Sequence, residues 1–316
     1  MQLGKNKRIF LAGHNGMVGT AILKKLKENG YRNIITRNRK QLDLLDQAKT
    51  FNFIKKNKPH FVIIAAARVG GILANIKHKS KFLYENLQIQ NNLIHGSYLC
   101  GVKNLFLLGS SCIYPKLCKQ PMKEEYLLTG PLEESNDAYA LAKIAGIKMC
   151  DYYSQNYKLN FKSLMPPNLY GPNDNYDLTK SHFYPALIKK IHNAKKKNKK
   201  KLIIWGSGKP KRELMFVNDF ADAVIFFMNR KIKESFINIG TGKDLSISWY
   251  AKFIMKKLNV KLKIKYDKTK PDGMLKKCLN IKRAKKYGWK TKNDFDNAFK
   301  ITYEDFLKKE SNKVST

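Results

Sequence analysis

The sequence predicts an α/β fold, in which a doubly wound parallel sheet is followed by a smaller C-terminal α/β domain. Three observations predict it. Short apolar runs alternate with helical patterns through the first half of the 316-residue chain. Residues 61–67 and 105–109 are apolar without interruption, which is typical of parallel strands covered by helices on both faces. A glycine-rich turn joins the first apolar run to a helical pattern.

We expect strands near residues 8–12, 33–36, 61–66, 104–108 and 161–165, with helices between them. The turn after the first strand reads Gly13, His14, Asn15, Gly16, Met17, Val18 and Gly19, and an apolar-periodic stretch at 18–26 opens the helix. Glycines at this spacing make a tight turn and admit a pyrophosphate to the backbone. The helix N-terminus adds N–H donors and a partial positive charge. This turn therefore predicts a Rossmann-type dinucleotide site.

The residues after the second strand indicate which dinucleotide binds. They read Arg37, Asn38, Arg39 and Lys40, and no acid occurs before Asp43. A site for NAD usually places a carboxylate here for the ribose 2′-hydroxyl, whereas arginine accommodates a 2′-phosphate. The charge pattern favours NADP, although a chain this basic carries cations in many of its loops.

The chain is strongly basic, with 62 Lys and Arg against 24 Asp and Glu and a formal charge of +38. Such a charge usually indicates a nucleic-acid or anionic membrane partner. The excess is almost all lysine and is spread along the chain, which favours a compositional bias. The dense run at 195–201 leads into an expected strand at 202–205 and lacks the aromatic residues of a single-strand binder. We therefore expect a solvated loop there and no nucleic-acid partner.

Five cysteines, at positions 100, 112, 118, 150 and 278, include no C-x-x-C pair. This pattern argues against a disulfide framework and a zinc site, and it favours a reducing compartment. The longest apolar stretch, 61–67, is too short to cross a bilayer, and no signal peptide precedes the first strand. We expect a cytoplasmic protein with no metal and no membrane association.

Tyr139 and Lys143 stand four residues apart in a helical pattern, which places a phenol and an ammonium on one helix face. A nearby cation favours the phenolate, so we expect Lys143 to lower the pKa of Tyr139. A tyrosine so tuned can exchange a proton with a sugar or alcohol oxygen while hydride moves at carbon. Taken alone, this spacing is more often a surface contact.

A loop with polar side chains follows the expected strand at 104–108, at the edge of the sheet where doubly wound folds bind ligands. Ser110 in this loop could hydrogen-bond a carbonyl oxygen alongside Tyr139. Cys112 would face the same pocket if the loop is extended. A lone cysteine is otherwise usually a small buried hydrophobe.

Five segments together resemble the GDP-L-fucose synthases, which are 3,5-epimerase/4-reductases of the extended short-chain dehydrogenase/reductase family. The segments are 12–19, 65–72, 109–115, 168–172 and 270–273, and the resemblance runs from about residue 7 to 309. The block at 110–115 and the later Ser181-His182 pair are far more specific than the glycine turn. The resemblance implies GDP-4-keto-6-deoxy-D-mannose as substrate, GDP-L-fucose as product and NADPH as reductant.

The resemblance also implies a role for each catalytic residue. The 4-keto group acidifies the hydrogens at C3 and C5, so inversion of both centres needs a base on one face and an acid on the other. These roles fall to Cys112 and His182. During hydride transfer to C4, Tyr139 protonates the developing alkoxide and Ser110 steadies the oxygen. Lys143 holds the charge state of the tyrosine and grips the nicotinamide ribose.

Further contacts are implied position by position. Those with the cofactor, besides the glycine turn, are Arg37, Arg39, Asp43, Leu44, Ala66, Leu108, Gly109, Ser110, Ser111, Tyr139, Lys143, Pro166, Pro167, Asn168, Leu169 and His182. Those with the GDP-sugar are Lys190, Trp205, Arg212 and Asp272, which offer cations for the diphosphate, a flat apolar face and a hydroxyl acceptor. Asn15 and Lys190 stand where relatives often carry arginine. The first departure weakens the preference for NADP slightly, and the second replaces bidentate phosphate binding with a point charge.

Three other functions fit the fold. A sugar-nucleotide 4,6-dehydratase would need an acid pair where Ser111 and Cys112 stand, so we reject it. A 4-reductase of a related GDP-4-keto-6-deoxy sugar or heptose, with or without epimerase activity, would keep Tyr139 and Lys143 but need not use the cysteine and histidine. A non-catalytic dinucleotide-binding or nucleic-acid-binding protein is the most distant alternative, because the catalytic set is intact.

The division of the chain follows from the same pattern. We expect an NADP-binding domain at 1–170, joined by later segments at about 214–245, and a domain at 171–316 that mainly binds the GDP-sugar. Helices around 80–99 and 138–157 resemble those that pair relatives into homodimers through a four-helix bundle. We therefore expect a homodimer.

Overall fold

The computed structural model describes residues 3–270 and 272–314. Within them the central feature is a six-stranded parallel sheet with the strand order β2-β1-β3-β4-β5-β9. Its strands are β1 (Ile9–Ala12), β2 (Ile34–Ile35), β3 (Phe61–Ile64), β4 (Asn104–Leu108), β5 (Asn160–Met165) and β9 (Phe236–Asn238). The expected doubly wound fold is confirmed, although β2 and β3 are shorter than the sequence pattern predicts.

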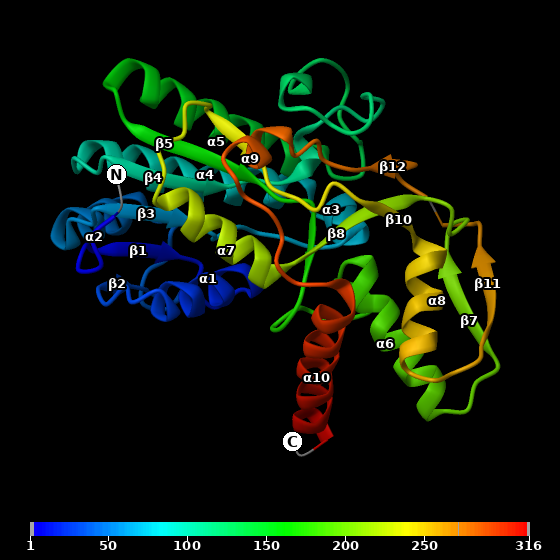
Figure 1. The fold of residues 1–316 in the computed structure, drawn as a ribbon. Coiled ribbons are helices and arrows are strands. Elements are labelled where there is room, and N and C mark those ends of the chain that lie inside the picture. The colour runs from blue at the N-terminus through cyan, green and yellow to red at the C-terminus, as the bar shows by residue number, and fades with distance from the viewer. Residues whose placement is uncertain (1–2, 271, 315–316) are drawn as a thin grey trace.

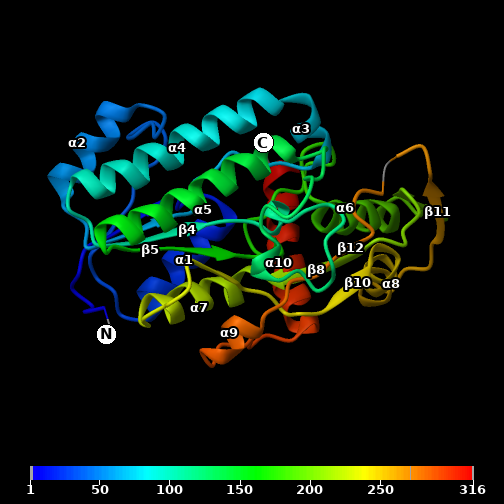
Figure 2. The ribbon, with the colours of Figure 1, turned by 90° about the horizontal axis from the view of Figure 1, so that it is seen from above.

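Helices cover both faces of this sheet, because alternate side chains of each strand enter two separate cores. Ile9 and Leu11 of β1 pack with α1 (Met17–Glu28) and α7 (Val217–Met228) on one face. Phe10 packs with α2 (Gln47–Asn57), α4 (Lys79–Leu99) and α5 (Asp137–Tyr157) on the other. Figures 1 and 2 show these two helix layers on either side of the sheet. The uninterrupted apolar runs in the sequence are thereby explained.

The second half of the chain adds a smaller α/β part, seen on the right of Figure 1. One sheet contains β6 (Asn168–Tyr170), β8 (Lys211–Phe216), β10 (Asp244–Ser246) and β12 (Lys276–Lys277), and another pairs β7 (Lys201–Trp205) with β11 (Lys263–Asp267). A third core lies among α6 (Phe183–Lys196), α8 (Ile247–Lys257) and α10 (Phe295–Val314). The short helices α3 (Ile72–Lys77) and α9 (Lys282–Lys286) and the 3₁₀ turns η1 (Ser111–Ile113) and η2 (Glu124–Tyr126) complete the described elements.

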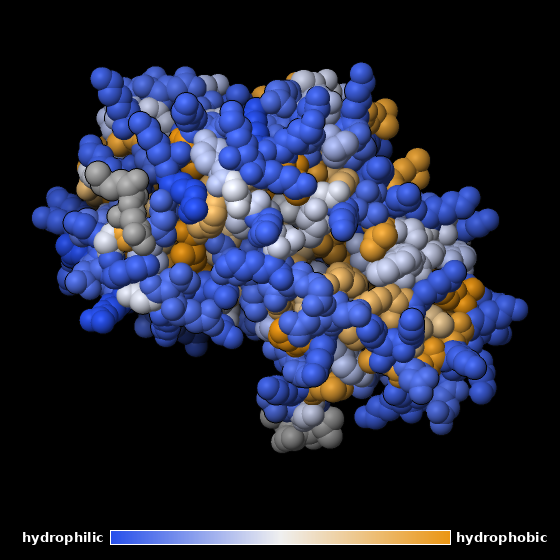
Figure 3. Space-filling model, viewed as in Figure 1, coloured by the Kyte–Doolittle hydropathy of each residue, from blue (hydrophilic) through white to orange (hydrophobic). Residues whose placement is uncertain are grey.

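The surface is largely hydrophilic on the face shown in Figure 3. The lysine run at 195–201 is solvent-exposed as expected, but it is not one loop. Helix α6 continues through Lys196 and β7 begins at Lys201, so only a short connection remains between them. In the part of the chain that the structure describes, no helix is both long and apolar enough to span a membrane.

One buried carboxylate connects the two parts of the fold. Glu213 of β8 is 1% exposed, and its side chain accepts hydrogen bonds from the backbone N–H groups of Thr241, Gly242 and Leu279 at 2.5, 2.8 and 2.6 Å. These three donors lie in the loop after β9 and in the segment after β12. Glu213 therefore fixes where β12 enters the second sheet.

Replacing Glu213 with alanine should lower the free energy of unfolding by at least about 3 kcal/mol, because it leaves several buried N–H groups without an acceptor. Urea unfolding of the variant and the wild type measures this difference. Glu304→Ala, at an exposed position of α10, is the control and should change stability by less than about 0.5 kcal/mol. Equal stability of Glu213→Ala and wild type would contradict the role given to this carboxylate.

Candidate active site

The glycine turn lies at the carboxyl end of β1. The next two strands of the chain, β2 and β3, lie on opposite sides of β1, and doubly wound sheets bind ligands at such a point. Gly13 has φ +89°, and a Cβ there would lie 2.5 Å from the backbone nitrogen of Ala66. A Cβ on Gly19 would collide with the carbonyl oxygen of Gly13. Gly16 caps α1 without a side-chain hydrogen bond, so the N–H groups of the first turn remain available to an anion. The geometry fits the pyrophosphate of a dinucleotide.

The loops after β3, β4 and β5 meet beside this turn. Ala66 packs against Gly13, and the backbone N–H of Ser111 donates to the carbonyl of Pro166 at 3.0 Å. Gly109 donates in the same way to Leu164 at 2.9 Å. The cofactor positions predicted after these strands are thus brought to one edge of the sheet.

The cations expected to face a 2′-phosphate follow β2. Arg37 donates to the carbonyl of Thr36 at 2.7 Å and lies over the ring of Phe53, with the guanidinium 5.4 Å from its centroid. Arg39 lies 3.8 Å from the carboxylate of Asp43 in a loose pair, and both side chains are well exposed. Asp43 therefore pairs with Arg39 and not with Arg37.

The phenol and the ammonium predicted from the sequence lie on α5. The Lys143 ammonium is 5.7 Å from the centroid of the Tyr139 ring and donates to the carbonyl of Leu108 at 2.9 Å. Burial lowers the pKa of Lys143 to about 8. Burial also raises the pKa of Tyr139 well above its usual value, and the nearby Cys112 thiol adds to the rise. The expected lowering of the Tyr139 pKa is therefore wrong for this structure, because desolvation outweighs the neighbouring cation.

The buried ammonium predicts a pH-dependent stability difference between wild type and Lys143→Met. Between pH 8 and 10.5 the folded protein binds fewer protons at Lys143 than the unfolded chain, so wild-type stability rises with pH through this window. We expect Lys143→Met to be about 1–3 kcal/mol more stable than wild type at pH 7, because loss of the bond to Leu108 offsets part of the gain. Urea unfolding across this pH range should show the difference shrinking toward pH 10. A constant difference would contradict the lowered pKa.

Cys112 lies in the 3₁₀ turn η1, so the loop is not extended at this position. Ser110 precedes the turn, and its hydroxyl accepts from the backbone N–H of Cys112 at 3.4 Å. The residue Cys112 is 5% exposed, and burial raises the pKa of its thiol. The charge of Lys277, hydrogen bonding by Ser110 and the charge of Lys143 oppose that rise. The turn nevertheless places the cysteine beside the serine and the Tyr139–Lys143 pair.

His182 stands immediately before α6, as the sequence indicates. The preceding Lys180 carbonyl accepts from the backbone N–H of Gly71 at 2.9 Å, which ties this segment to the loop after β3. The residue keeps exposed surface, yet desolvation of the imidazole lowers its pKa, and repulsion from Lys277 lowers it further. The histidine is therefore neutral at pH 7.

Lys277 is the site residue that sequence reasoning missed. Its charge acts on both Cys112 and His182, so it lies within electrostatic range of the two groups. Burial lowers its own pKa, and the Cys112 thiol opposes the change. The register of β12 on β8 places Lys277 opposite Arg212. One lysine among 62 basic residues carries no distinguishing signal in the sequence.

The four positions expected to contact a GDP-sugar also come together. The Lys190 ammonium lies 4.9 Å from the centroid of the Trp205 ring. Arg212 donates to the carbonyls of Asp272 and Met274 at 3.2 and 2.5 Å, and the Asp272 carboxylate accepts from the Ser207 N–H at 2.6 Å. Two cations, an indole and a carboxylate therefore gather between β7, β8 and the segment before β12. Such a set suits a nucleotide diphosphate with its sugar.

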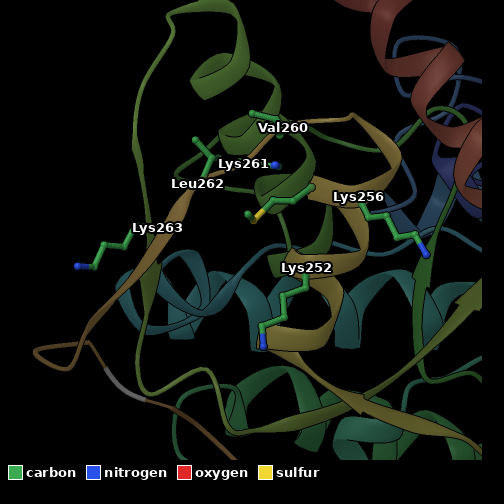
Figure 4. Close-up of a pocket in the computed structure, with 7 residues that line it drawn as sticks. Lys252, Lys256, Val260, Lys261, Leu262 and Lys263 are labelled. Atoms are coloured by element: carbon green, nitrogen blue, oxygen red, sulfur yellow. The ribbon is translucent and has the colours of Figure 1, made fainter.

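A separate hollow of about 480 Å³ lies between α8 and β11, and none of the predicted site residues lines it. Figure 4 shows Lys252, Lys256, Lys261 and Lys263 around the apolar side chains of Val260 and Leu262. Among the described residues there is no group of three or more His, Cys, Asp and Glu that could hold a metal ion.

Comparison with known proteins agrees with this arrangement. The NAD dependent epimerase/dehydratase family model matches residues 9–240. A GDP-L-fucose synthase of Sinorhizobium fredii is 46% identical over 307 residues, which cover 97% of this chain and 98% of the relative. A GDP-L-fucose synthetase structure from Naegleria fowleri, bound to NADP, has a TM-score of 0.88 at 28% identity and covers 98% of this chain and 96% of that one.

A second solved structure, a GDP-6-OMe-4-keto-L-xylo-heptose reductase from Campylobacter jejuni, is also similar. Its TM-score is 0.91 at 33% identity, and the match covers 98% of this chain and 100% of that one. The names of these three proteins share a GDP-linked sugar and differ in which sugar it is.

Proposed function

The chain belongs to the NAD dependent epimerase/dehydratase family, and from that premise we propose that it converts GDP-4-keto-6-deoxy-D-mannose to GDP-L-fucose. The conversion comprises epimerisation at C3 and C5 and an NADPH-dependent reduction at C4. The observation that carries the proposal is the meeting of a reductase pair, Tyr139 and Lys143, with Cys112, which forms a second proton-transfer pair with His182 in this proposal. Lys277 lies within electrostatic range of the second pair.

Epimerisation needs one group that accepts a proton and one that donates a proton across the sugar ring. The 4-keto group makes the hydrogens at its two neighbouring carbons acidic, and removal of either gives an enolate that is reprotonated from the other face. The raised pKa keeps the Cys112 thiol protonated at neutral pH, and the lowered pKa keeps His182 neutral. The pair therefore starts with one donor and one acceptor. The Lys277 charge favours a thiolate whenever the cysteine gives up its proton.

Reduction at C4 uses the groups on and beside α5. NADPH, when bound along the glycine turn, supplies the hydride. Tyr139 keeps its proton because burial raises its pKa, so it can donate to the oxygen as negative charge develops there. Ser110 offers a hydroxyl to the same oxygen. Lys143 stabilises the resulting phenolate and binds the nicotinamide ribose.

The remaining site residues follow from the same proposal. The glycine turn and Arg37 bind the NADP phosphates, with Arg39, Asp43 and Leu44 nearby. The rest of the cofactor is lined by Ala66, Leu108, Gly109, Ser111, Pro166, Pro167, Asn168, Leu169 and His182. Lys190, Trp205, Arg212 and Asp272 bind the GDP-sugar. This assigns residues 1–170 and the returning segment at about 214–245 to the cofactor, and it assigns 171–316 mainly to the sugar nucleotide. Placement of β9 and α7 on the large sheet supports the division.

The assembly and compartment belong to the proposal as well. Large apolar side chains are exposed on the outer surfaces of α4 and α5, among them Tyr84, Leu99, Leu141 and Tyr152. Burial of these helices against a second copy would form the expected four-helix bundle of a homodimer. All five cysteines are described and unpaired, which suits a reducing, cytoplasmic compartment.

The direct test is NADPH consumption by the purified protein on GDP-4-keto-6-deoxy-D-mannose, with NADH as the comparison cofactor. The proposal predicts turnover on this substrate with NADPH preferred. Turnover on a GDP-4-keto-heptose alone would favour the heptose reductase that the Campylobacter likeness suggests. Absence of turnover on either sugar would contradict an enzymatic role for this site.

A further inference from the structure

A loop outside the predicted site touches the glycine turn. The residue involved is Asn173, which follows β6 and has φ +67°. Its side-chain amide donates to the carbonyl of Asn15 at 3.0 Å and to the hydroxyl of Thr20 at 3.2 Å. Asparagine is among the few residues that adopt this left-handed conformation readily. The loop therefore presents its amide to the turn without a strained backbone.

The far side of Asn173 is held by the C-terminal helix. The Asp305 carboxylate of α10 accepts from the backbone N–H of Asn173 at 2.9 Å. The Lys309 ammonium donates to the Asn173 side-chain oxygen at 3.2 Å and to the Asp174 carbonyl at 3.0 Å. Asp305 and Lys309 also lie 3.6 Å apart. Asn173 thus connects α10, which packs in the smaller part of the fold, to a turn of the large sheet.

These contacts fix two successive carbonyl groups of the glycine turn. The Thr20 hydroxyl donates to the His14 carbonyl at 3.0 Å, and Asn173 holds the Asn15 carbonyl. The N–H of the Asn15–Gly16 peptide donates to the Gly13 carbonyl at 3.2 Å, so this peptide is held at both its oxygen and its nitrogen. Because a peptide unit is planar, holding both ends sets the orientation of the whole plane. The orientation of this peptide plane in turn sets the position of the α1 N-terminus relative to the turn.

We propose that Asn173 is a positioning residue for the cofactor, which keeps the glycine turn in its phosphate-binding conformation and anchors it to α10. The inference rests on the proposed binding of NADPH by this turn. It makes the C-terminal helix a support of the cofactor site, although the helix contributes none of the predicted cofactor contacts. Loss of the Asn173 contacts should therefore weaken NADPH binding more than binding of the sugar nucleotide.

The test is Asn173→Gly in the full-length protein, with binding of NADPH and of GDP measured separately by titration. Glycine tolerates the positive φ and removes the amide without adding charge. Asn198→Gly is the matched control, because Asn198 also has a positive φ, +48°, and lies in the connection between α6 and β7. Lys309→Met is a second variant, which removes the anchor on α10 and leaves the turn and Asn173 in place.

We expect Asn173→Gly to raise the NADPH dissociation constant about three- to tenfold, as loss of one or two hydrogen bonds implies, and to leave GDP binding within about twofold. Lys309→Met should raise the NADPH dissociation constant by less. Asn198→Gly should change the dissociation constant of neither ligand. Unchanged NADPH binding in Asn173→Gly, or equal weakening of NADPH and GDP, would overturn the inference alone. Failure of the wild type to bind NADPH would overturn it together with the proposed function.

Discussion

Tyr139→Phe is expected to abolish reduction at C4 while proton exchange beside the keto group continues. In the proposed mechanism the phenol protonates the developing alkoxide, and loss of a general acid lowers a rate by about 10²–10⁴-fold. Its raised pKa means that nearly every molecule carries the proton at neutral pH and is ready to donate it. Cys112 and His182 are unchanged in this variant. NADPH oxidation measures the first effect, and deuterium incorporation from solvent into the substrate measures the second.

Tyr152→Phe is the matched control for this experiment. Tyr152 lies on the same helix, α5, and is 54% exposed, so loss of its hydroxyl should leave both rates near wild type. If Tyr139→Phe also lost solvent exchange at C3 and C5, the tyrosine would act in both steps and the separation of roles would fail. Retention of NADPH oxidation would remove Tyr139 from the mechanism.

Cys112→Ser is expected to stop epimerisation first. A serine hydroxyl is far less acidic than a thiol and cannot be converted to a useful base by the nearby charge of Lys277. We expect solvent exchange at C3 and C5 to fall by about 10²–10⁴-fold. Reduction to GDP-L-fucose falls with it, because the inverted keto sugar no longer forms. Serine is close to cysteine in size, so the buried turn should keep its shape.

The control for the cysteine is Cys118→Ser, six positions later and half-buried. Both variants lose one thiol, and both thiols lie within electrostatic range of Lys277. Of the two, Cys112 is the one beside Ser110 and close to Tyr139 and Lys143. Product formation is measured by NMR of the sugar nucleotide. Unchanged turnover in Cys112→Ser would contradict the epimerase mechanism.

Much of the fold follows from local patterns in the chain. The apolar runs of β3 and β4 predict a sheet covered on both faces, because side chains of alternating direction must enter two cores. The steric needs at Gly13 and Gly19 explain why glycines at this spacing, between a strand and a helix, predict the turn. The four-residue spacing of Tyr139 and Lys143 likewise depends only on helix geometry.

Other features depend on contacts between distant segments and could not be predicted in this way. Lys277 reaches the site because β12 pairs with β8. This pairing places Lys277 opposite Arg212, which is 65 positions earlier in the sequence. The direction of the Tyr139 pKa depends on burial, which spacing does not report. The gathering of Lys190, Trp205, Arg212 and Asp272 was expected from the family resemblance and not from any local pattern. Asn173 carries no sequence signal at all until its partners on α10 are known.

The central claim is that one site both epimerises and reduces a GDP-linked keto sugar. The most direct measurement is incubation of the purified protein with GDP-4-keto-6-deoxy-D-mannose and NADPH in deuterated water, followed by NMR of the product. We expect GDP-L-fucose that carries deuterium at C3 and C5, because both centres exchange with solvent before hydride reaches C4. A product reduced at C4 without deuterium at those carbons would contradict the claim and would leave a simple reductase.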